Sequence, residues 1–407
     1  MSQAKEPSKV TTTGDLVPRL KDQGYENELI DKRRTWIEAK TGSQLDTVGA
    51  YDIPGPDMRG NIENPIGTVQ MPLGVAGPLL VNGDKARGTF YVPMATTEGV
   101  LVRSYERGMV AMTRAGGATA RLYMDENRIT PVFFFDNVAK AHDFTTTING
   151  HFEEIRQEAD ATTHHGKLLR LECFPLGRQV QVGFCYHTGD AQGMNMIVKA
   201  TQAACQWIVA KGLASEYYIF SGMNSEKRAS GFLLQGGKGK KLTAGVRIPA
   251  GLLQMYLHVS PTEMFNVWQH TVLGHMQANA IGYNGHFANG ITAIFIACGQ
   301  DVANVANSSI GITNFEVLDD GDLYASVTLP SLSVATVGGG VGLGTSRECL
   351  EMMGCSGEDS AVKFAEIVAS SLLAGELSMG AAIASGEFVH AHERYGRNRP
   401  TSELQGQ

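Results

Sequence analysis

The sequence has few cysteines, no long apolar run and no excess of basic charge, and each shortage excludes a class of protein. Its 407 residues contain six cysteines and no CxxC pair, which is typical of buried reduced thiols and not of a disulfide framework. No run of about 18 uninterrupted apolar residues occurs, so we expect no helix that spans a bilayer. Lysine and arginine number 34 against 41 aspartates and glutamates, which argues against a nucleic-acid-binding surface.

The amino end, MSQAKEPSKVTTTGD, is polar and lacks the apolar stretch of a secretory signal. Hydrophobic residues make up 43% of the chain and charged residues 18%, a globular composition. We therefore expect a cytoplasmic, soluble enzyme with no nucleic-acid or membrane partner.

The common catalytic and phosphate-binding motifs are missing. VGGGVGLGTS (337–346) does not fit GxGxxG, and QGGKGKK (235–241) lacks the first glycine and the final Ser/Thr of a P-loop. No GxSxG and no HExxH occurs. His164 and His165 have no nearby Cys, Asp or Glu cluster to complete a ligand set, so no metal site is predicted.

The hydrophobic pattern predicts an α+β protein in which a small domain is inserted into a larger α/β domain. Residues 1–60 form a charged N-terminal segment with one exposed helix, NELIDKRRTWIEAKTG, that ends at Gly42. Residues 131–219 read as strand PVFFF, a polar helix from Phe152, the hairpin LLRLECFPLGRQVQVGFCYH and a helix from about Met194 to Ala210. Residues 61–130 and 220–392 form the large domain, and 393–407 a polar, mobile tail.

Three helices are predicted in the large domain. The first runs from Thr97 to Met112, with Thr97 as its cap and Glu98 in its first turn. The second begins at the capping box Ser260–Pro–Thr–Glu263. The third covers Ser360 to about Gly380.

Four polar residues stand out, although the residues alone leave two interpretations of each. Asp301 follows the apolar run ITAIFIACGQ and either lies at the lip of a buried element or caps a turn. Lys227, in the small-residue loop SGMNSEKRAS, is otherwise a surface lysine. Glu98 is otherwise an ordinary first-turn acid, and His392 an ordinary histidine of a polar tail.

Six segments taken together resemble the class I 3-hydroxy-3-methylglutaryl-CoA (HMG-CoA) reductases, specifically their catalytic portion without a membrane anchor. They are ENPIGTVQMPLGVAGPL (63–79), PMATTEGVLVRSYERG (93–108), GDAQGMNM (189–196), IGYNGHFANGITAIFIACGQD (281–301), LPSLSVATVGGGVGLG (329–344) and AGELSMGAAIASGEFVHAH (374–392). The resemblance implies a large domain that binds the CoA thioester and an inserted ferredoxin-like domain, 131–219, that binds NADP.

The resemblance also implies a four-electron reduction, in which two hydrides from NADPH convert HMG-CoA to mevalonate and CoA. Lys227 matches the lysine beside the developing oxyanion, and Glu98 matches the acid that supplies a proton. Asp301 matches the buried aspartate that links these two residues. His392 matches the histidine that protonates the departing CoA thiolate.

Substrate-binding residues carry over from the family as well. His286 and Asn289 match positions that touch the substrate and CoA, while Ser221, Glu226 and Arg228 flank Lys227 where the acyl carboxylate binds. Glu226 replaces an aspartate and Arg228 a lysine. The arginine that pairs with the carboxylate falls on Ile129 by ungapped count, and Arg128 is one position away.

For the cofactor, the resemblance implies two backbone segments and an arginine. The residues are Asp190, Met194, Asn195 and Met196 at a helix N-terminus that holds the pyrophosphate, Gly338, Gly339 and Gly340 in a closely approaching loop, and Arg178, Arg397 or Arg399 for the adenosine 2′-phosphate. Such an arginine favours NADPH.

The family shares its active sites between subunits, so a homodimer or homotetramer is expected. Two alternatives stay open. One is a paralogue that reduces another acyl-CoA thioester, suggested by the position of Arg128. The other is a catalytically idle CoA-binding relative, against which the set Glu98, Lys227, Asp301 and His392 argues.

Overall fold

The computed structural model describes residues 16–18, 24–163 and 165–387, which fall into two compact units divided between Met71 and Pro72. In the first unit, α1 (Asn27–Thr41) is followed by α2 (Asp46–Gly49) and the 3-10 helix η3 (Gly55–Met58). Tyr25, Ile30 and Met58 form a small core. The helix α1 ends at Gly42, whose left-handed backbone confirms the predicted stop.

The second unit contains two antiparallel sheets. Hairpin β1 (Leu73–Asn82) and β2 (Arg87–Ala95) forms one. The other has the strand order β7-β4-β6-β3-β8-β10-β9, with β5 paired to β6. Its strands are β3 (Thr119–Ile129), β4 (Val132–Phe134), β5 (Lys167–Leu176), β6 (Gln179–His187), β7 (Glu216–Tyr218), β8 (Lys238–Ile248), β9 (Ile312–Val317) and β10 (Leu323–Leu332).

Helices cover these sheets. They are α3 (Leu101–Arg114), α4 (Val138–Thr147), α5 (Phe152–Asp160), α6 (Met194–Ala210), α7 (Ala250–Leu257), α8 (Pro261–Gln277), α9 (Phe287–Ala297), α10 (Val305–Ser308), α11 (Gly344–Met352) and α12 (Ser360–Ala384). Short 3-10 turns are η4 (Ile148–His151), η5 (Gly231–Gln235), η6 (Val302–Asn304) and η7 (Gly339–Gly342). The mixture of helices and antiparallel strands confirms the α+β class.

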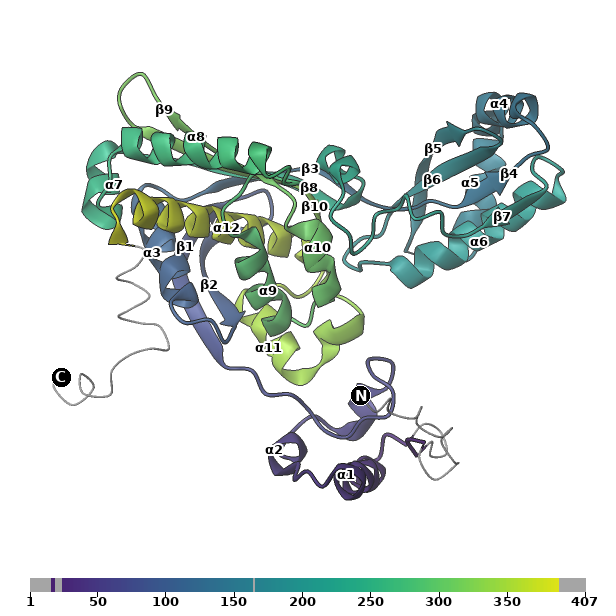
Figure 1. Ribbon diagram of the computed structural model, residues 1–407, viewed down its shortest axis with the longest axis horizontal. Helices are drawn as coiled ribbons and strands as arrows, with labels where there is room; N and C mark the ends of the chain where they lie inside the picture. Colours follow the sequence, from purple (N-terminus) through teal and green to yellow (C-terminus); the bar gives the residue numbers. More distant parts are fainter. Residues whose placement is uncertain (1–15, 19–23, 164, 388–407) are drawn as a thin grey trace, which may run out of the picture. The chain divides into compact units, whose positions relative to one another are not determined.

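One sheet serves two hydrophobic cores. Figure 1 shows α4, α5 and α6 beside β4 to β7, and α8 and α12 beside β8 to β10. The first group encloses a core drawn from residues 129–214, and the second a core drawn from 76–120 and 242–381. The ladder that joins them is short, because β3 pairs with β6 only from Asn127 to Ile129.

The central helix α12 is long and apolar enough to cross a membrane by length and composition, yet 78% of its apolar window is buried in the protein. Its contacts with α3, α9, β8 and β10 are those of a core helix.

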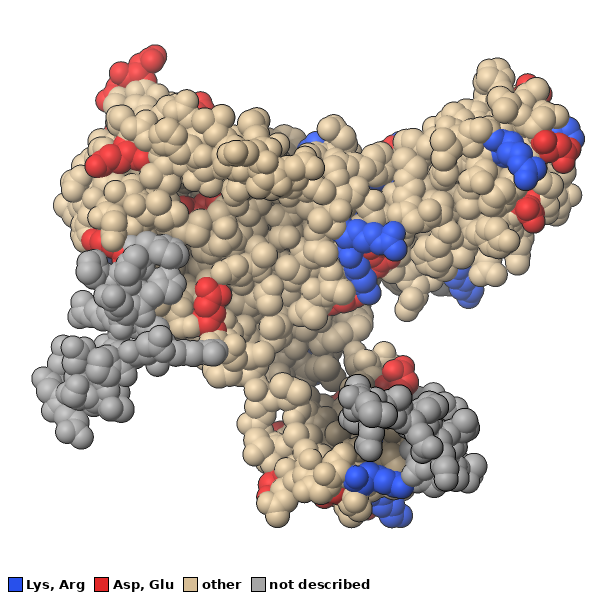
Figure 2. Space-filling model, viewed as in Figure 1, with Lys and Arg blue, Asp and Glu red and all other residues tan. Residues whose placement is uncertain are grey.

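On the face shown in Figure 2, positive and negative side chains are scattered, without a broad basic stripe.

Most predicted elements are confirmed, and one helix start is wrong. The capping box of Ser260 and Glu263 and the bounds of α6 are as predicted. The helix α3 begins at Leu101 and not after Thr97, because Val100 adopts a left-handed conformation (φ 77°) that starts the helix there. Glu98 therefore lies in the turn before α3.

Candidate active site

Lys227 and Asp301 form an ion pair at the surface of the second unit. Lys227 lies in the loop between β7 and η5, and Asp301 follows α9 at the start of η6. The Lys227 Nζ is 2.7 Å from Oδ2 of Asp301, with 44% and 40% of the two side chains exposed. The hydrogen bond that Lys227 donates to the Asp301 carboxylate raises the pKa of Lys227, so the lysine stays charged. Oδ1 of Asp301 also accepts from the backbone N of Ala303, so the turn-capping interpretation holds as well.

The loop that carries Lys227 has a constrained backbone. Ser225 and Lys227 have φ values of 52° and 56°, which are uncommon for residues with a Cβ. The Lys227 backbone N donates to Oδ1 of Asn307 at 3.2 Å, and the Ser221 side chain donates to the carbonyl oxygen of Thr130 at 2.7 Å. These bonds hold the loop at Ser221 and at Lys227.

Four of the predicted residues line one polar cavity in this loop: Ser221, Glu226, Lys227 and Arg228. With Asp301 they are called the lysine cluster below. Two lysine or arginine side chains beside a carboxylate can bind an anionic group and stabilise a developing oxyanion.

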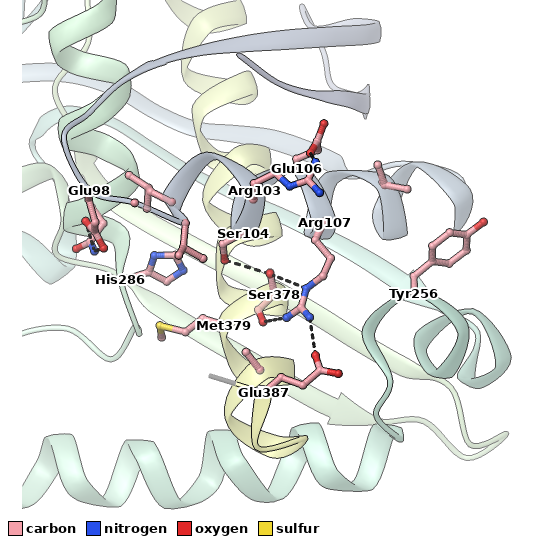
Figure 3. A pocket seen from close by; sticks show the side chains of 16 residues that line it. Glu98, Arg103, Ser104, Glu106, Arg107, Tyr256, His286, Ser378, Met379 and Glu387 are labelled. Carbon is pink, nitrogen blue, oxygen red and sulfur yellow. Dashed lines mark hydrogen bonds and ion pairs between the residues drawn. The ribbon is translucent and has the colours of Figure 1, made fainter. Parts of the chain in front are cut away.

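A second group of predicted residues, the glutamate cluster, consists of Glu98, His286 and Asn289. The Asn289 Nδ2 donates to both carboxylate oxygens of Glu98 at 3.2 Å. All three residues line a cavity of about 480 Å³ between α3, α7 and α12. Figure 3 shows Glu98 and His286 at one end of this cavity and Tyr256 toward the other.

His286 is held from below by buried groups. Its backbone N donates to the buried carboxylate of Glu376 at 2.9 Å. The centroid of its ring lies 5.2 Å from that of Tyr105, and the two rings are close to perpendicular. Its Nε2 is buried and has no hydrogen-bond partner among residues 16–18, 24–163 and 165–387. A buried polar atom without a partner needs an explanation, and a ligand bound at this cavity would supply one.

Sequence reasoning missed the charged residues at the far side of this cavity. Arg107 donates to Oγ and to the carbonyl oxygen of Ser378, at 3.1 and 2.6 Å, and to Oε2 of Glu387 at 3.1 Å (Figure 3). His258 lies 3.1 Å from the other oxygen of Glu387. Arg107 belongs to the matched segment 93–108, but its sequence shows only an arginine on a helix and gives no sign that it faces a cavity.

The two clusters do not touch within the part of the chain that the structure describes. Asn289 lies in the first turn of α9, whereas Asp301 follows the other end of that helix. Eleven residues that each rise about 1.5 Å put roughly 16 Å between the ends of α9. The predicted link from Asp301 to Glu98 is therefore absent here, and Asp301 is half-exposed instead of buried.

The N-terminus of α6 fits a dinucleotide. Gly193 precedes the helix with a φ of 76°, and no side chain in the described structure caps it, so the first backbone N–H groups can meet a pyrophosphate. Met194, Asn195 and Met196 form this first turn. Three buried polar atoms nearby lack partners in the described chain: Asn127 Oδ1, Gln192 Nε2 and Thr336 Oγ1.

Asp190 has a structural partner. Its carboxylate accepts from the backbone N of Asp359 at 3.1 Å and of Ala361 at 2.8 Å, at the start of α12. Its carbonyl oxygen accepts from the backbone N of Thr336, which brings the loop before Gly338 next to α6. Gly338 and Gly339 have positive φ values of 83° and 58°, and a Cβ on Gly340 would meet the carbonyl oxygen of Gly299 at 2.7 Å.

Two predicted arginines lie away from these groups. Arg178 precedes β6 whereas α6 follows it, and nine strand residues span about 30 Å. One ribose carries both the pyrophosphate arm and the 2′-phosphate, so Arg178 and α6 cannot serve the same cofactor within one chain.

Arg128 is buried in β3, where Nη1 bonds Oε2 of Glu172 at 2.9 Å and the guanidinium stacks 4.3 Å above the ring of Phe232. It does not line the polar cavity of the lysine cluster.

His392, Arg397 and Arg399 lie outside the described residues, as does the predicted mobile tail 393–407.

Comparisons with known proteins agree with the predicted resemblance. The family model described as hydroxymethylglutaryl-coenzyme A reductase matches residues 29–397. A 3-hydroxy-3-methylglutaryl-coenzyme A reductase of Methanocaldococcus jannaschii is 41% identical, over 94% of this chain and 97% of its own. One of Haloferax volcanii is 38% identical, over 94% and 97%.

Solved structures show the same fold. A class II 3-hydroxy-3-methylglutaryl-CoA reductase of Streptococcus pneumoniae, bound to NADPH in open conformations, superposes with a TM-score of 0.66 at 20% identity. The match covers 87% of this chain and 96% of that one. The archaeal relatives are about twice as similar in sequence, which agrees with the predicted class I assignment. The chain therefore belongs to the hydroxymethylglutaryl-coenzyme A reductase family.

Proposed function

We propose that the chain is an oxidoreductase that uses NADPH to reduce (S)-HMG-CoA to mevalonate and CoA, in the mevalonate pathway of isoprenoid synthesis. The observation that carries this proposal is the Lys227–Asp301 pair, which holds a charged lysine at the mouth of a polar cavity. Family membership over residues 29–397 supports the same reaction.

The residues suit the chemistry of thioester reduction. Hydride addition puts negative charge on the carbonyl oxygen, and Lys227 supplies the cation that stabilises it. Asp301 keeps that cation protonated. Glu98 supplies a proton to the same oxygen. NADPH supplies the hydride, and His392 protonates the CoA thiolate as the resemblance implies.

The 480 Å³ cavity next to Glu98 suits the pantetheine arm of CoA. It begins at the glutamate cluster and leads to Arg107, whose guanidinium lies beside Glu387. A long, mostly apolar chain with two amides fits such a lining. The thioester would then lie where His286 and Glu98 can reach it.

NADPH is the proposed cofactor because the N-terminus of α6 presents free N–H groups beside unpaired polar atoms. The solved streptococcal relative binds NADPH. With Arg178 at the other end of β6, Arg397 and Arg399 are the remaining partners proposed for the 2′-phosphate.

The protein is further proposed to be at least a dimer with active sites shared between subunits. Glu98 and Lys227 serve one reacting oxygen, yet α9 separates their clusters within a chain. A second copy can bring its lysine cluster to the glutamate cluster of the first.

The cytoplasm is the proposed location, because all six cysteines are free and five are buried.

One observation favours a different acyl group. Arg128 bonds Glu172, stacks on Phe232 and does not line the polar cavity, so the acyl carboxylate would rely on Lys227 and Arg228. A paralogue that reduces another acyl-CoA thioester is therefore the second candidate.

The deciding experiment follows nicotinamide absorbance with purified protein, HMG-CoA and either NADPH or NADH, and measures released CoA in parallel. We expect two NADPH oxidised per CoA. Faster turnover with NADH would keep the reaction and change the cofactor. Folded protein that is inactive with both, but active with another acyl-CoA thioester, would establish the second candidate instead.

A further inference from the structure

Lys238 is a fully buried lysine at the junction of three elements. It is the first residue of β8, and its Nζ lies 3.2 Å from the carbonyl oxygen of Arg128 in β3. It also lies 3.2 Å from Sδ of Met194, the first residue of α6, and 3.7 Å from Oε2 of Glu226. A buried ammonium group is costly unless its partners compensate for lost water, so its place here requires a reason.

The glycines of QGGKGKK account for this burial. Gly236, Gly237 and Gly239 have φ values of 97°, 89° and 91°. A Cβ on Gly237 would lie 3.0 Å from Nη1 of Arg128, and one on Gly239 would lie 2.4 Å from the carbonyl oxygen of Leu332. The segment that fails as a phosphate-binding motif therefore fits between β3 and β10 and carries its lysine inside the protein.

The position of Glu226 indicates a role for Lys238. Glu226 lines the polar cavity beside Lys227, called the acyl cavity from here on, where its negative charge would repel an anionic acyl group unless it were offset. Glu226 also lies between Ser225 and Lys227, two non-glycine residues of this loop with positive φ. A fixed Glu226 side chain therefore helps to hold the constrained loop in place.

We propose that Lys238 is a positioning residue, whose buried ammonium group holds Glu226, offsets its charge beside the acyl cavity and ties the Lys227 loop to the N-terminus of α6. This inference rests on the proposed function. The charged groups that face the ammonium are Glu226 and Lys227 from the loop and Arg128 from β3. The helix α6 contributes only the uncharged Met194.

The geometry has a consequence for pH. Burial lowers the pKa of Lys238 to about 8. Below this pH the lysine is charged and offsets Glu226, whereas above it the lysine is neutral and Glu226 repels the carboxylate of HMG-CoA. The dissociation constant for HMG-CoA should therefore rise as the pH passes about 8.

The test compares Lys238→Met, Glu226→Gln, the double variant and Lys238→Arg, with the partly exposed Lys241→Met on the same strand as control. Calorimetry gives the dissociation constant for HMG-CoA from about pH 7 to about pH 9, and steady-state rates give kcat and KM. We expect Lys238→Met to weaken binding at least tenfold, and the double variant to bind no worse than Glu226→Gln. Lys238→Arg should bind with little change over this pH range, because arginine does not titrate there.

Three results would overturn the role of Lys238: additive losses in the double variant, an unchanged rise with pH in Glu226→Gln, or a loss as large in Lys241→Met. If Lys238→Met does not fold, the pH series of the wild type and of Glu226→Gln still decides. If the wild type binds HMG-CoA but its dissociation constant does not rise with pH and the variants do not differ as expected, this inference alone is refuted. A wild type that binds no HMG-CoA refutes the proposed function and this inference with it.

Discussion

Single residues show how far a sequence leads toward this site. Lys227 and Asp301 could be predicted through their segments, and the structure places them 2.7 Å apart. Lys238 could not be predicted, because QGGKGKK reads as a polar surface segment and only the packing of β3 and β10 buries it. The contacts of Arg128 could not be predicted either, because its neighbours Glu172 and Phe232 come from distant parts of the chain.

The Lys227–Asp301 pair makes a prediction about pH. Asp301 raises the pKa of Lys227, so Asp301→Asn should let the lysine lose its proton at lower pH. The alkaline limb of the kcat profile should then move to lower pH, with a lower maximum. The control is Asp136→Asn, which breaks the exposed Asp136–Lys140 pair. An alkaline limb that stays in place in Asp301→Asn would show that Lys227 is not the group that titrates.

At the scale of helices and strands, local signals predicted most of the second unit. The bounds of α6 and the cap of α8 follow from periodicity and from Ser260 with Glu263. The start of α3 did not follow, because Thr97 looks like a cap, whereas the left-handed Val100 sets the boundary through the surrounding packing. The bonds of the Asp190 carboxylate to the start of α12 did not follow from the sequence either, which predicted Asp190 only as a cofactor residue.

Asp190 therefore offers a test of its structural part. Asp190→Ala removes both bonds to the first turn of α12 and should cost about 1 kcal/mol of stability, as a lost helix cap does. Calorimetric melting without cofactor measures this, with the exposed Asp143→Ala as control. An unchanged melting temperature combined with a raised KM for NADPH would make Asp190 a cofactor residue after all.

Glycines set the distance between α3, α9 and α12. A Cβ on Gly375 would lie 2.5 Å from Cζ of Tyr105, and one on Gly290 would lie 2.0 Å from its hydroxyl. Gly375→Ala should therefore cost about 1–3 kcal/mol through overpacking. Gly274→Ala meets nothing within 4 Å and should stabilise α8 by about 1 kcal/mol. Denaturant unfolding of both variants measures the contrast, and equal effects would contradict this account of the packing.

At the largest scale, the second unit joins two cores through one sheet, with only Asn127 to Ile129 of β3 paired to β6. The presence of both cores could be predicted from strand and helix patterns. Their shared sheet could not, because the pairing of β3 with β8 joins segments more than a hundred residues apart. The division of the site into a lysine cluster and a glutamate cluster was equally beyond the sequence.

The proposed sharing of active sites between subunits predicts that two inactive variants restore each other's activity. Glu98→Gln and Lys227→Ala should each abolish turnover in the isolated protein. In an equal random mixture of dissociated and reassembled subunits, half of the dimers are mixed and each has one intact site, so about a quarter of wild-type activity should return. Mixing Lys227→Ala with Asp301→Asn is the control and should give no more than the average of the two variants' own activities. No recovery in the first mixture would place both clusters of a working site on one chain.

If active sites are shared between subunits as proposed, the separation of the two clusters along α9 also has a genetic consequence. In a cell with two altered copies of the gene, a lesion at Glu98 in one copy and at Lys227 in the other would complement each other. Two lesions on the same side of the shared site would not. A panel of such allele pairs, scored by growth alone, would assign every functional residue to one of two complementation groups.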